Sequence, residues 1–136
     1  MLNMLQYIDA HCHLSENPTD INVGAIYNAT RQSDWKNIIA ITDAQQNVFG
    51  AIGVHPWYVS DITSDWESEL YKLLCQNPEL LVGEIGLDKH KPDIETQTRV
   101  FCAQMLLAHE LKRGVCLHSV GTWDKILNIL KVYRNK

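Results

Sequence analysis

The 136-residue chain lacks several features that mark whole classes of protein. It has only four cysteines and no Cys-x-x-Cys pair, so neither a redox motif nor the disulfide framework of a small secreted protein is indicated. No apolar run approaches the roughly 18 residues of a membrane span, and the N-terminal sequence MLNMLQYIDAHCHL lacks the basic start of a signal peptide. We therefore expect reduced thiols, no membrane contact and a cytoplasmic location.

Basic residues are also too few for a broad nucleic-acid-binding surface. The chain has 12 Lys+Arg against 16 Asp+Glu and a formal charge of −4. This balance still allows an anionic substrate that is held through a bound metal. The composition, 46% hydrophobic and 21% charged, is that of a globular protein, and the absence of repeats and linker-like stretches predicts one domain over residues 1–136.

Short apolar runs alternate with longer helical patterns, which is typical of a parallel α/β sheet with right-handed crossovers. Periodicity leaves Val23–Tyr27 undecided between strand and helix. We expect strands at Gln6–Ala10 running into His11–His13, Ile38–Thr42, Val48–Val54, Leu80–Leu87 and Val115–His118.

Three helices are expected between and after these strands. Ser64 and Glu67 have the spacing of a capping box at the start of the first helix. The second runs from about Asp93 to Arg113, with Gly114 just past its end in the C′ position. The third begins near Thr122 and continues to the end of the sequence.

Candidate metal ligands lie where the first expected strand ends, in Asp9-Ala-His11-Cys-His13. Side chains alternate along a strand, so Asp9, His11 and His13 would share one face. Two imidazoles there can hold one cation, with Asp9 as an acceptor behind them. A pair of satisfied or solvated histidines is the alternative, and the short motif does not decide between the two.

Two further strand ends carry groups of the same kind. Glu84 lies in an apolar run between Gly83 and Gly86, where an unpaired carboxylate would be costly to bury and where the glycines allow close approach. His118 ends the fifth expected strand and would point to the same edge of the sheet. An ion-paired structural glutamate and a packing histidine are the alternatives.

The run Gly-Val-His55-Pro-Trp57 marks one more strand end. His55 would contact substrate or stabilise the turn, and Trp57 offers a ring for stacking. The segment Lys89-His90-Lys91 would contact an anion or form a solvated face.

Taken together, IDAHCHL, GVHPW, GEIGLD and a helix with Gln97-x-x-x-Phe101-x-x-Gln104 leading to LHS resemble the TatD family of metal-dependent hydrolases, within the wider amidohydrolase group of barrel enzymes. The resemblance covers nearly the whole chain and implies a parallel (β/α) barrel of the TIM type. It implies a metal-bridged water that attacks a phosphodiester of DNA, with two divalent ions, zinc, manganese or magnesium, sharing Glu84. The ligands that it implies are His11, His13, Glu84 and His118.

The length is short for such a barrel. Eight units take roughly 250 residues, about 31 each, so 136 residues supply about four to five. The family's site also uses a histidine after the sixth strand and an aspartate near the eighth, both beyond Lys136. We therefore expect a barrel truncated to about the first five strands, with weak or no enzymatic activity. The chain would be either a truncated product or a protein that closes its sheet by self-association.

Two other functions stay open at this point. One is a non-catalytic remnant with a partial metal site, and the other is an amidohydrolase-type enzyme that acts on an amide or ester. The segment Thr42–Asn47, too short for a full helix between strands, suggests a pared-down version of the family.

Overall fold

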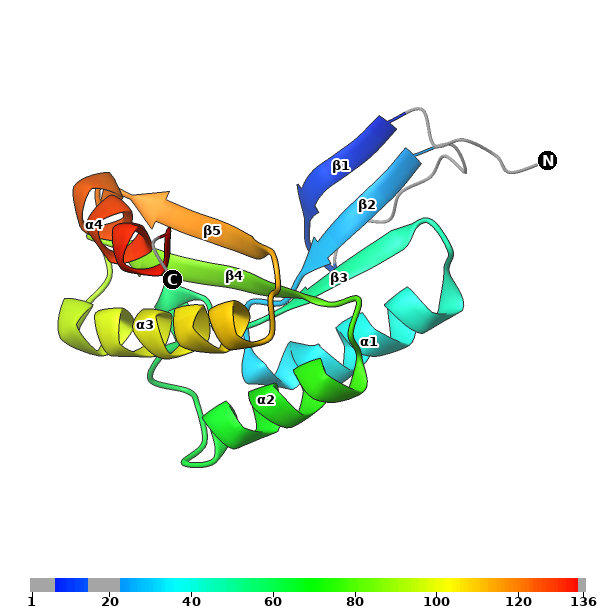
Figure 1. The fold of residues 1–136 in the computed structure, drawn as a ribbon, viewed down its shortest axis with the longest axis horizontal. Coiled ribbons are helices and arrows are strands. Elements are labelled where there is room, and N and C mark those ends of the chain that lie inside the picture. The colour runs from blue at the N-terminus through cyan, green and yellow to red at the C-terminus, as the bar shows by residue number, and fades with distance from the viewer. Residues whose placement is uncertain (1–6, 15–22, 135–136) are drawn as a thin grey trace.

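The computed structural model of the protein describes residues 7–14 and 23–134 and contains one parallel sheet (Figure 1). The strands pair in chain order, each parallel to the next, which confirms the predicted α/β architecture of five strands. They are β1 (Tyr7–Cys12), β2 (Val23–Asn28), β3 (Val48–Ile52), β4 (Leu81–Asp88) and β5 (Val115–Val120).

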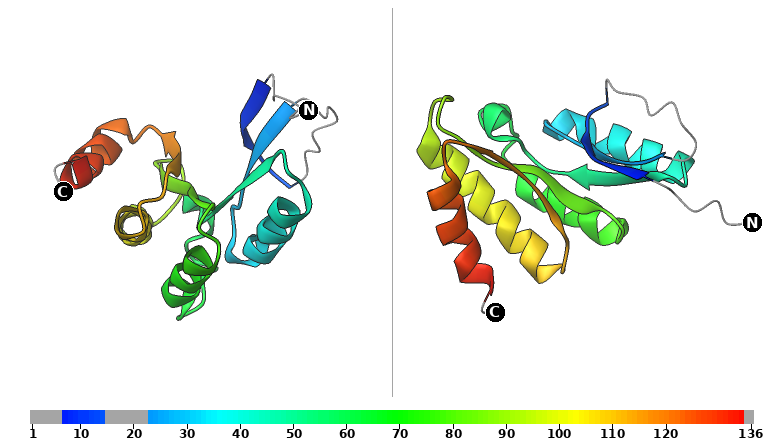
Figure 2. Two further views of the ribbon diagram at one scale, coloured as in Figure 1. Left: turned by 45° about the vertical axis from the view of Figure 1, so that its right-hand side comes forward. Right: turned by 90° about the horizontal axis from the view of Figure 1, so that it is seen from above.

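Helices α1, α2 and α3 follow one another along one side of the sheet, and α4 lies beside β5 (Figures 1 and 2). Each presents at least one fully buried apolar residue to the core, as each crossover helix of a parallel sheet must. The helices are α1 (Trp35–Ala44), α2 (Trp66–Gln76), α3 (Ile94–Glu110) and α4 (Trp123–Arg134), with short 3₁₀ turns η1 (Gln32–Asp34) and η2 (Pro56–Tyr58).

The predicted strand at Ile38–Thr42 is wrong, because these residues lie in α1. A five-residue apolar run fits a helix as well as a strand, and the buried Trp35 and Ile38 show the three-residue helical spacing. Val23–Tyr27, left undecided above, lies in β2 instead. The inference of a pared-down family member from Thr42–Asn47 falls with it, since the crossover helix α1 begins at Trp35 and ends within that segment.

The predicted helix ends also need correction. The first residue before α2 is Asp65 rather than Ser64, and no side-chain hydrogen bond caps the helix there, so the capping box is not formed. After α3, the left-handed position is taken by Lys112, with φ 54°, and not by Gly114. The predicted start of α3 near Asp93 is correct, and Asp93 is its N-cap, because its carboxylate accepts from the Thr96 amide.

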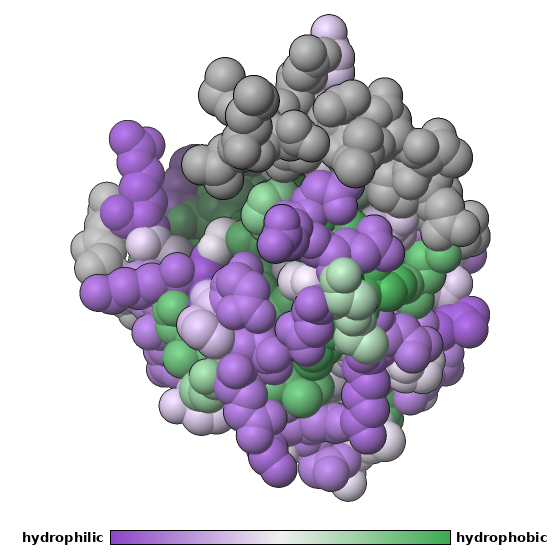
Figure 3. Space-filling model, turned by 90° about the vertical axis from the view of Figure 1, so that its right-hand side faces the viewer, coloured by the Kyte–Doolittle hydropathy of each residue, from purple (hydrophilic) through white to green (hydrophobic). Residues whose placement is uncertain are grey.

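Hydrophilic side chains cover most of the face seen in Figure 3, with hydrophobic residues showing between them. None of the helices in the described part of the chain is long and apolar enough to cross a membrane. The four cysteines all lie in the described part of the chain, and none of them is in a disulfide there. The outer strands of the sheet are β1 and β5, and self-association through them stays a prediction.

Candidate metal centre

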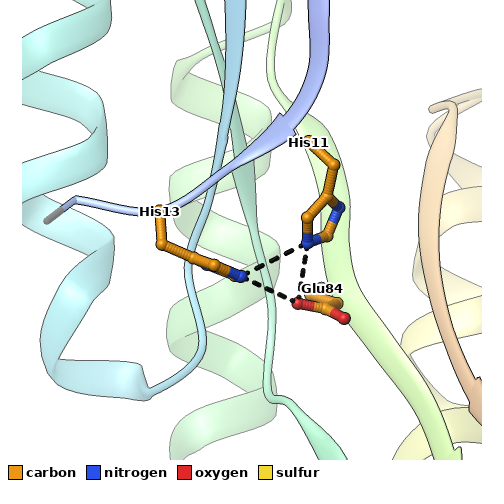
Figure 4. Close-up of side chains that lie close together, drawn as sticks. All are labelled: His11, His13 and Glu84. Carbon is orange, nitrogen blue, oxygen red and sulfur yellow. Dashed lines mark hydrogen bonds and ion pairs between the residues drawn. The ribbon is translucent and has the colours of Figure 1, made fainter. Parts of the chain in front are cut away.

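The buried carboxylate of Glu84 on β4 lies where the strand-end histidines converge. His11 at the end of β1 and His13 just after it both point toward this carboxylate (Figure 4). His11 Nε2 lies 3.1 Å from Glu84 Oε2, His13 Nε2 lies 3.5 Å from the same oxygen, and the two nitrogens are 3.3 Å apart. Three ligand atoms from two non-adjacent strands therefore surround one point.

The other carboxylate oxygen of Glu84 faces a second pair of imidazoles. His118 Nδ1, on β5, lies 3.1 Å from Oε1, and His55 Nε2 lies 3.6 Å from it. The two histidine nitrogens are 3.0 Å apart. In each group the ligand atoms all lie within 4.8 Å of one another, and Glu84 belongs to both groups.

Hydrogen bonds on the outer side of the rings set which nitrogen carries the proton. His13 Nδ1 lies 3.0 Å from the carbonyl of Asn28, and since a carbonyl only accepts, this nitrogen is the donor. His118 Nε2 lies 3.1 Å from the carboxylate of Asp88 and is likewise the donor. A neutral ring then keeps its lone pair on the nitrogen that faces Glu84, which is the arrangement of a metal-binding histidine.

His55 has the opposite arrangement. Its Nδ1 accepts the Trp57 amide N–H at 3.2 Å, so the proton of a neutral ring is on Nε2. This Nε2–H points at His118 Nδ1 and Glu84 and can donate to an oxygen placed there. His55 therefore stabilises the turn, one of the two alternatives expected from the sequence, and contact with a substrate stays a prediction.

The electrostatics of Glu84 keep it ionised. Burial raises the pKa of the carboxyl, but the hydrogen bond from His55 and the positive charge that His55, His11 and His118 carry when protonated outweigh burial and lower the pKa to about 2. The acceptor nitrogen of His13 and the ionised carboxylate face each other at 3.5 Å, and two acceptors need a proton or a cation between them. Imidazole with carboxylate is also a donor set that divalent zinc and manganese accept, so the residues present fit a metal ion.

Asp88 at the end of β4 was not singled out as a site residue from the sequence. Its carboxylate is buried and accepts from Trp57 Nε1 at 2.7 Å, from the His90 amide at 2.9 Å and from His118 Nε2. Burial raises the pKa of Asp88, but these three hydrogen bonds lower it to about 2. The signal was present in the sequence, because Asp88 lies four residues after Glu84 on the same strand.

Asp9 does less than predicted. Its carboxylate accepts from the backbone amide of His11 at 3.1 Å, so it fixes the chain rather than the ring. The pairing of β1 with β2 shifts register between Asp9 and Cys12, which breaks the simple alternation of faces.

The end of β2 supports the site through its backbone. The carbonyl of Asn28 accepts from His13 Nδ1, that of Ala29 from the Glu84 amide at 2.9 Å, and that of Thr30 from the His55 amide at 2.9 Å. Three consecutive carbonyls thus each hold a different site residue. Sequence reasoning missed this segment because it reads side chains, and the segment contributes only backbone carbonyls to these contacts.

Two fully buried glutamines of α3 fix the other strand ends. Gln104 accepts the Val54 amide at 2.6 Å and donates to the Val54 carbonyl at 3.2 Å, directly before His55. Gln97 accepts the Asp88 amide at 2.9 Å and donates to the Asp88 carbonyl at 3.2 Å. Each glutamine therefore satisfies both backbone groups of a residue at or next to the site.

The predicted close approach at Gly86 is present. Its φ is 153°, and a Cβ there would lie 1.8 Å from the carbonyl oxygen of His118. The cavity in front of the histidines has a volume of about 270 Å³ and is lined by His13, Thr30, His55, Trp57, Tyr58, Glu84 and His118. His109 lies outside this site, with its ring centroid 5.7 Å from that of Tyr133.

Comparisons of the sequence and of the structure with known proteins identify the same family. Residues 8–136 match the family model described as TatD related DNase. The crystal structure of YjjV, a TatD homolog from Escherichia coli K12, aligns with a TM-score of 0.86 and 28% identity, covering 95% of this chain and 56% of YjjV. This structural similarity confirms that the five parallel strands have the barrel-type α/β fold expected from the sequence.

Two relatives have names that state an activity. The 3'-5' ssDNA/RNA exonuclease TatD of Erwinia tasmaniensis is 34% identical over 87 residues, which are 62% of this chain and 33% of that protein. The human 3'-5' RNA nuclease TATDN2 is 26% identical over 93% of this chain and 20% of that protein. The chain spans about half the length of YjjV, whose sequence it matches over 55%.

Proposed function

From the premise that this chain belongs to the TatD family of metal-dependent hydrolases, we propose that it carries a two-metal site for the hydrolysis of phosphodiester bonds in DNA. The observation that carries the proposal is the position of Glu84 between two pairs of imidazoles, one pair on each carboxylate oxygen. A carboxylate shared in this way is what a pair of neighbouring cations needs.

The proposed ligands are His11, His13, Glu84 and His118. His13 and His118 qualify through the outer hydrogen bonds that leave a lone pair toward Glu84. His55 is the substrate contact, because its Nε2–H is a donor directed at the place where an oxygen of the substrate would lie. Asp88 and the carbonyl of Asn28 hold their histidines in the required orientation.

Two divalent ions at such a site would lower the pKa of a water molecule and stabilise the attacking and leaving oxygens. Zinc, manganese and magnesium all fit in charge, and the mixed donors favour zinc or manganese over magnesium. The names of the Erwinia and human relatives support a nucleic acid as the substrate, since both are named as nucleases.

The first test is the bound metal per chain, measured by elemental analysis after equilibration with zinc or manganese and removal of unbound ions. We expect one or more ions per chain, lost in His11→Ala and kept in His109→Ala. His109 is the matched control because it is a histidine outside the cluster. No bound metal in the wild-type chain would refute the proposed site.

The second test is cleavage. A labelled single-stranded oligodeoxynucleotide is incubated with the metal-loaded chain and with Glu84→Gln, and the products are separated by size. The proposal requires cleavage that depends on Glu84 and is abolished by a chelator. Hydrolysis of amide or ester substrates without any cleavage of DNA would favour the amidohydrolase alternative instead.

A further inference from the structure

We propose that Trp57 and Lys91 form a subsite that stacks an unpaired base of a single-stranded nucleic acid next to the imidazole–carboxylate cluster. The inference deepens the proposed function and rests on it for the identity of the polymer. The side chain of Trp57 is 48% exposed, although hydrogen bonds hold both its indole ring and its backbone.

Trp57 is held more tightly than an exposed tryptophan requires. Its indole Nε1 donates to the buried carboxylate of Asp88 at 2.7 Å, and its amide donates to His55. The ring centroid lies 5.4 Å from that of His55 and 6.4 Å from that of His118. A planar group on this ring would therefore lie beside the two histidines that face Glu84 Oε1.

A cation accompanies the ring. Lys91 Nζ lies 4.1 Å from the ring centroid of Trp57, and the backbone of Lys91 is fixed by the Asp88 carbonyl and by Gln97. Among the described residues, Lys91 makes no ion pair with a carboxylate. Its charge is thus available to an incoming anion without the loss of a salt bridge.

The same pairing occurs a second time at this cavity. Tyr58, the residue after Trp57, also lines it, and Arg31 Cζ lies 4.1 Å over the Tyr58 ring. Two neighbouring aromatic rings, each with a cation on its face, therefore border the space in front of the histidines.

Rings next to cations are the features that bind a single-stranded nucleic acid, because the bases stack and the phosphates pair with the cations. A duplex keeps its bases stacked on one another and cannot offer a face to Trp57 without unpairing. A phosphodiester without a base would use the cations alone. The structure therefore favours a substrate with an unpaired base beside the phosphate that is cleaved.

The test compares binding of a fluorescent single-stranded oligonucleotide with binding of its abasic sugar–phosphate counterpart, by anisotropy, in EDTA so that nothing is cleaved. Trp57→Leu should weaken binding of the base-containing strand by about 5- to 100-fold, the effect of losing one base–aromatic stack. Binding of the abasic strand should be unchanged. Trp123→Leu is the control, since Trp123 on α4 is 55% exposed and does not line the cavity.

Two further variants separate stacking from support of the site. Trp57→Phe keeps a ring but loses the bond to Asp88, so it should retain most of the affinity lost in Trp57→Leu. Lys91→Gln should weaken both strands and reduce the salt dependence of binding by about one phosphate contact. Because stacking uses only the base, the loss should be equal for DNA and RNA strands of one sequence.

The inference is overturned if Trp57→Leu weakens both strands equally or neither, if the loss occurs with only one kind of sugar, or if the wild-type chain binds neither strand. None of these results depends on bound metal or on cleavage. A chain that binds bases through Trp57 but cuts nothing would overturn the proposed hydrolysis and leave this subsite in place.

Discussion

The hydrogen bonds between Gln104 and the backbone of Val54 give a prediction whose size follows from the structure. Gln104 is 0% and Val54 1% exposed, so water cannot replace either bond. Val54 lies beyond the end of β3, where no neighbouring strand pairs its amide and carbonyl. Each buried backbone group left unpaired costs about 1–3 kcal/mol, so the loss of both costs about 2–6 kcal/mol.

The variant that isolates this effect is Gln104→Met, which keeps the length of the side chain and removes both hydrogen bonds. We expect the free energy of unfolding, measured by urea denaturation of the metal-free chain, to fall by about 2–6 kcal/mol. Gln104→Ala should fall further, because a cavity is added to the two unpaired groups.

The matched control is Gln76→Met, at the exposed end of α2, which should change the unfolding free energy by less than about 0.5 kcal/mol. The reasoning fails if Gln104→Met stays within about 1 kcal/mol of the wild type, because the strand end would then be held by something other than this glutamine.

Four further results are expected. Glu84→Gln should sharply reduce metal affinity with little change in helix content, read by metal titration and far-UV circular dichroism; unchanged affinity would remove Glu84 from the centre of the site. Asp88→Asn should weaken metal binding by about 10- to 100-fold, because His118 loses its ionised partner, and an unchanged affinity would contradict that role. Asp9→Asn should weaken binding less than His11→Ala, whereas equal losses would make Asp9 a ligand. In the metal-free chain, Glu84 and Asp88 have pKa values of about 2, against ordinary values of 4.5 and 3.8. The two ionised carboxylates therefore stabilise the folded chain fully at a pH above these ordinary values. This stabilisation is lost as the pH falls from about 4.5 toward 2. Urea denaturation at pH 6 and pH 3 measures that loss, and it should shrink when either carboxylate is replaced by its amide.

The convergence of the site residues was predictable because it follows from topology. In a parallel sheet all carboxyl ends meet at one edge, so the histidines at the end of β1 and in the second half of β5 lie toward the same edge as Glu84, in the middle of β4. Their order in the sequence was sufficient to bring His11, His13, Glu84 and His118 together. Neither packing detail nor helix boundaries were needed for that inference.

Other parts of the structure depend on information that a sequence pattern does not hold. The segment Ile38–Thr42 is as apolar as a buried strand, and only its packing in the folded protein shows that it is part of the helix α1. The orientation of each imidazole depends on an outer partner, Asp88 for His118 and a carbonyl for His13, and such partners come from other strands. Short-range sequence patterns therefore identify the candidate metal ligands, but not the hydrogen bonds that determine which nitrogen of each imidazole carries the proton.

The three carbonyls that follow β2 have a consequence for mutagenesis. Replacing the side chain of Asn28, Ala29 or Thr30 leaves the carbonyl oxygen where it was, so side-chain substitutions in this segment do not report on the hydrogen bonds that these carbonyls accept. An amide-to-ester replacement at the following peptide bond weakens one carbonyl as an acceptor without touching any side chain. Done at successive positions, it would weaken the hydrogen bonds to His13, Glu84 and His55 in turn, which no natural amino acid placed in this segment can do. Each replacement also removes one amide donor, whose partner is the Ala51 carbonyl or the Asp34 carboxylate.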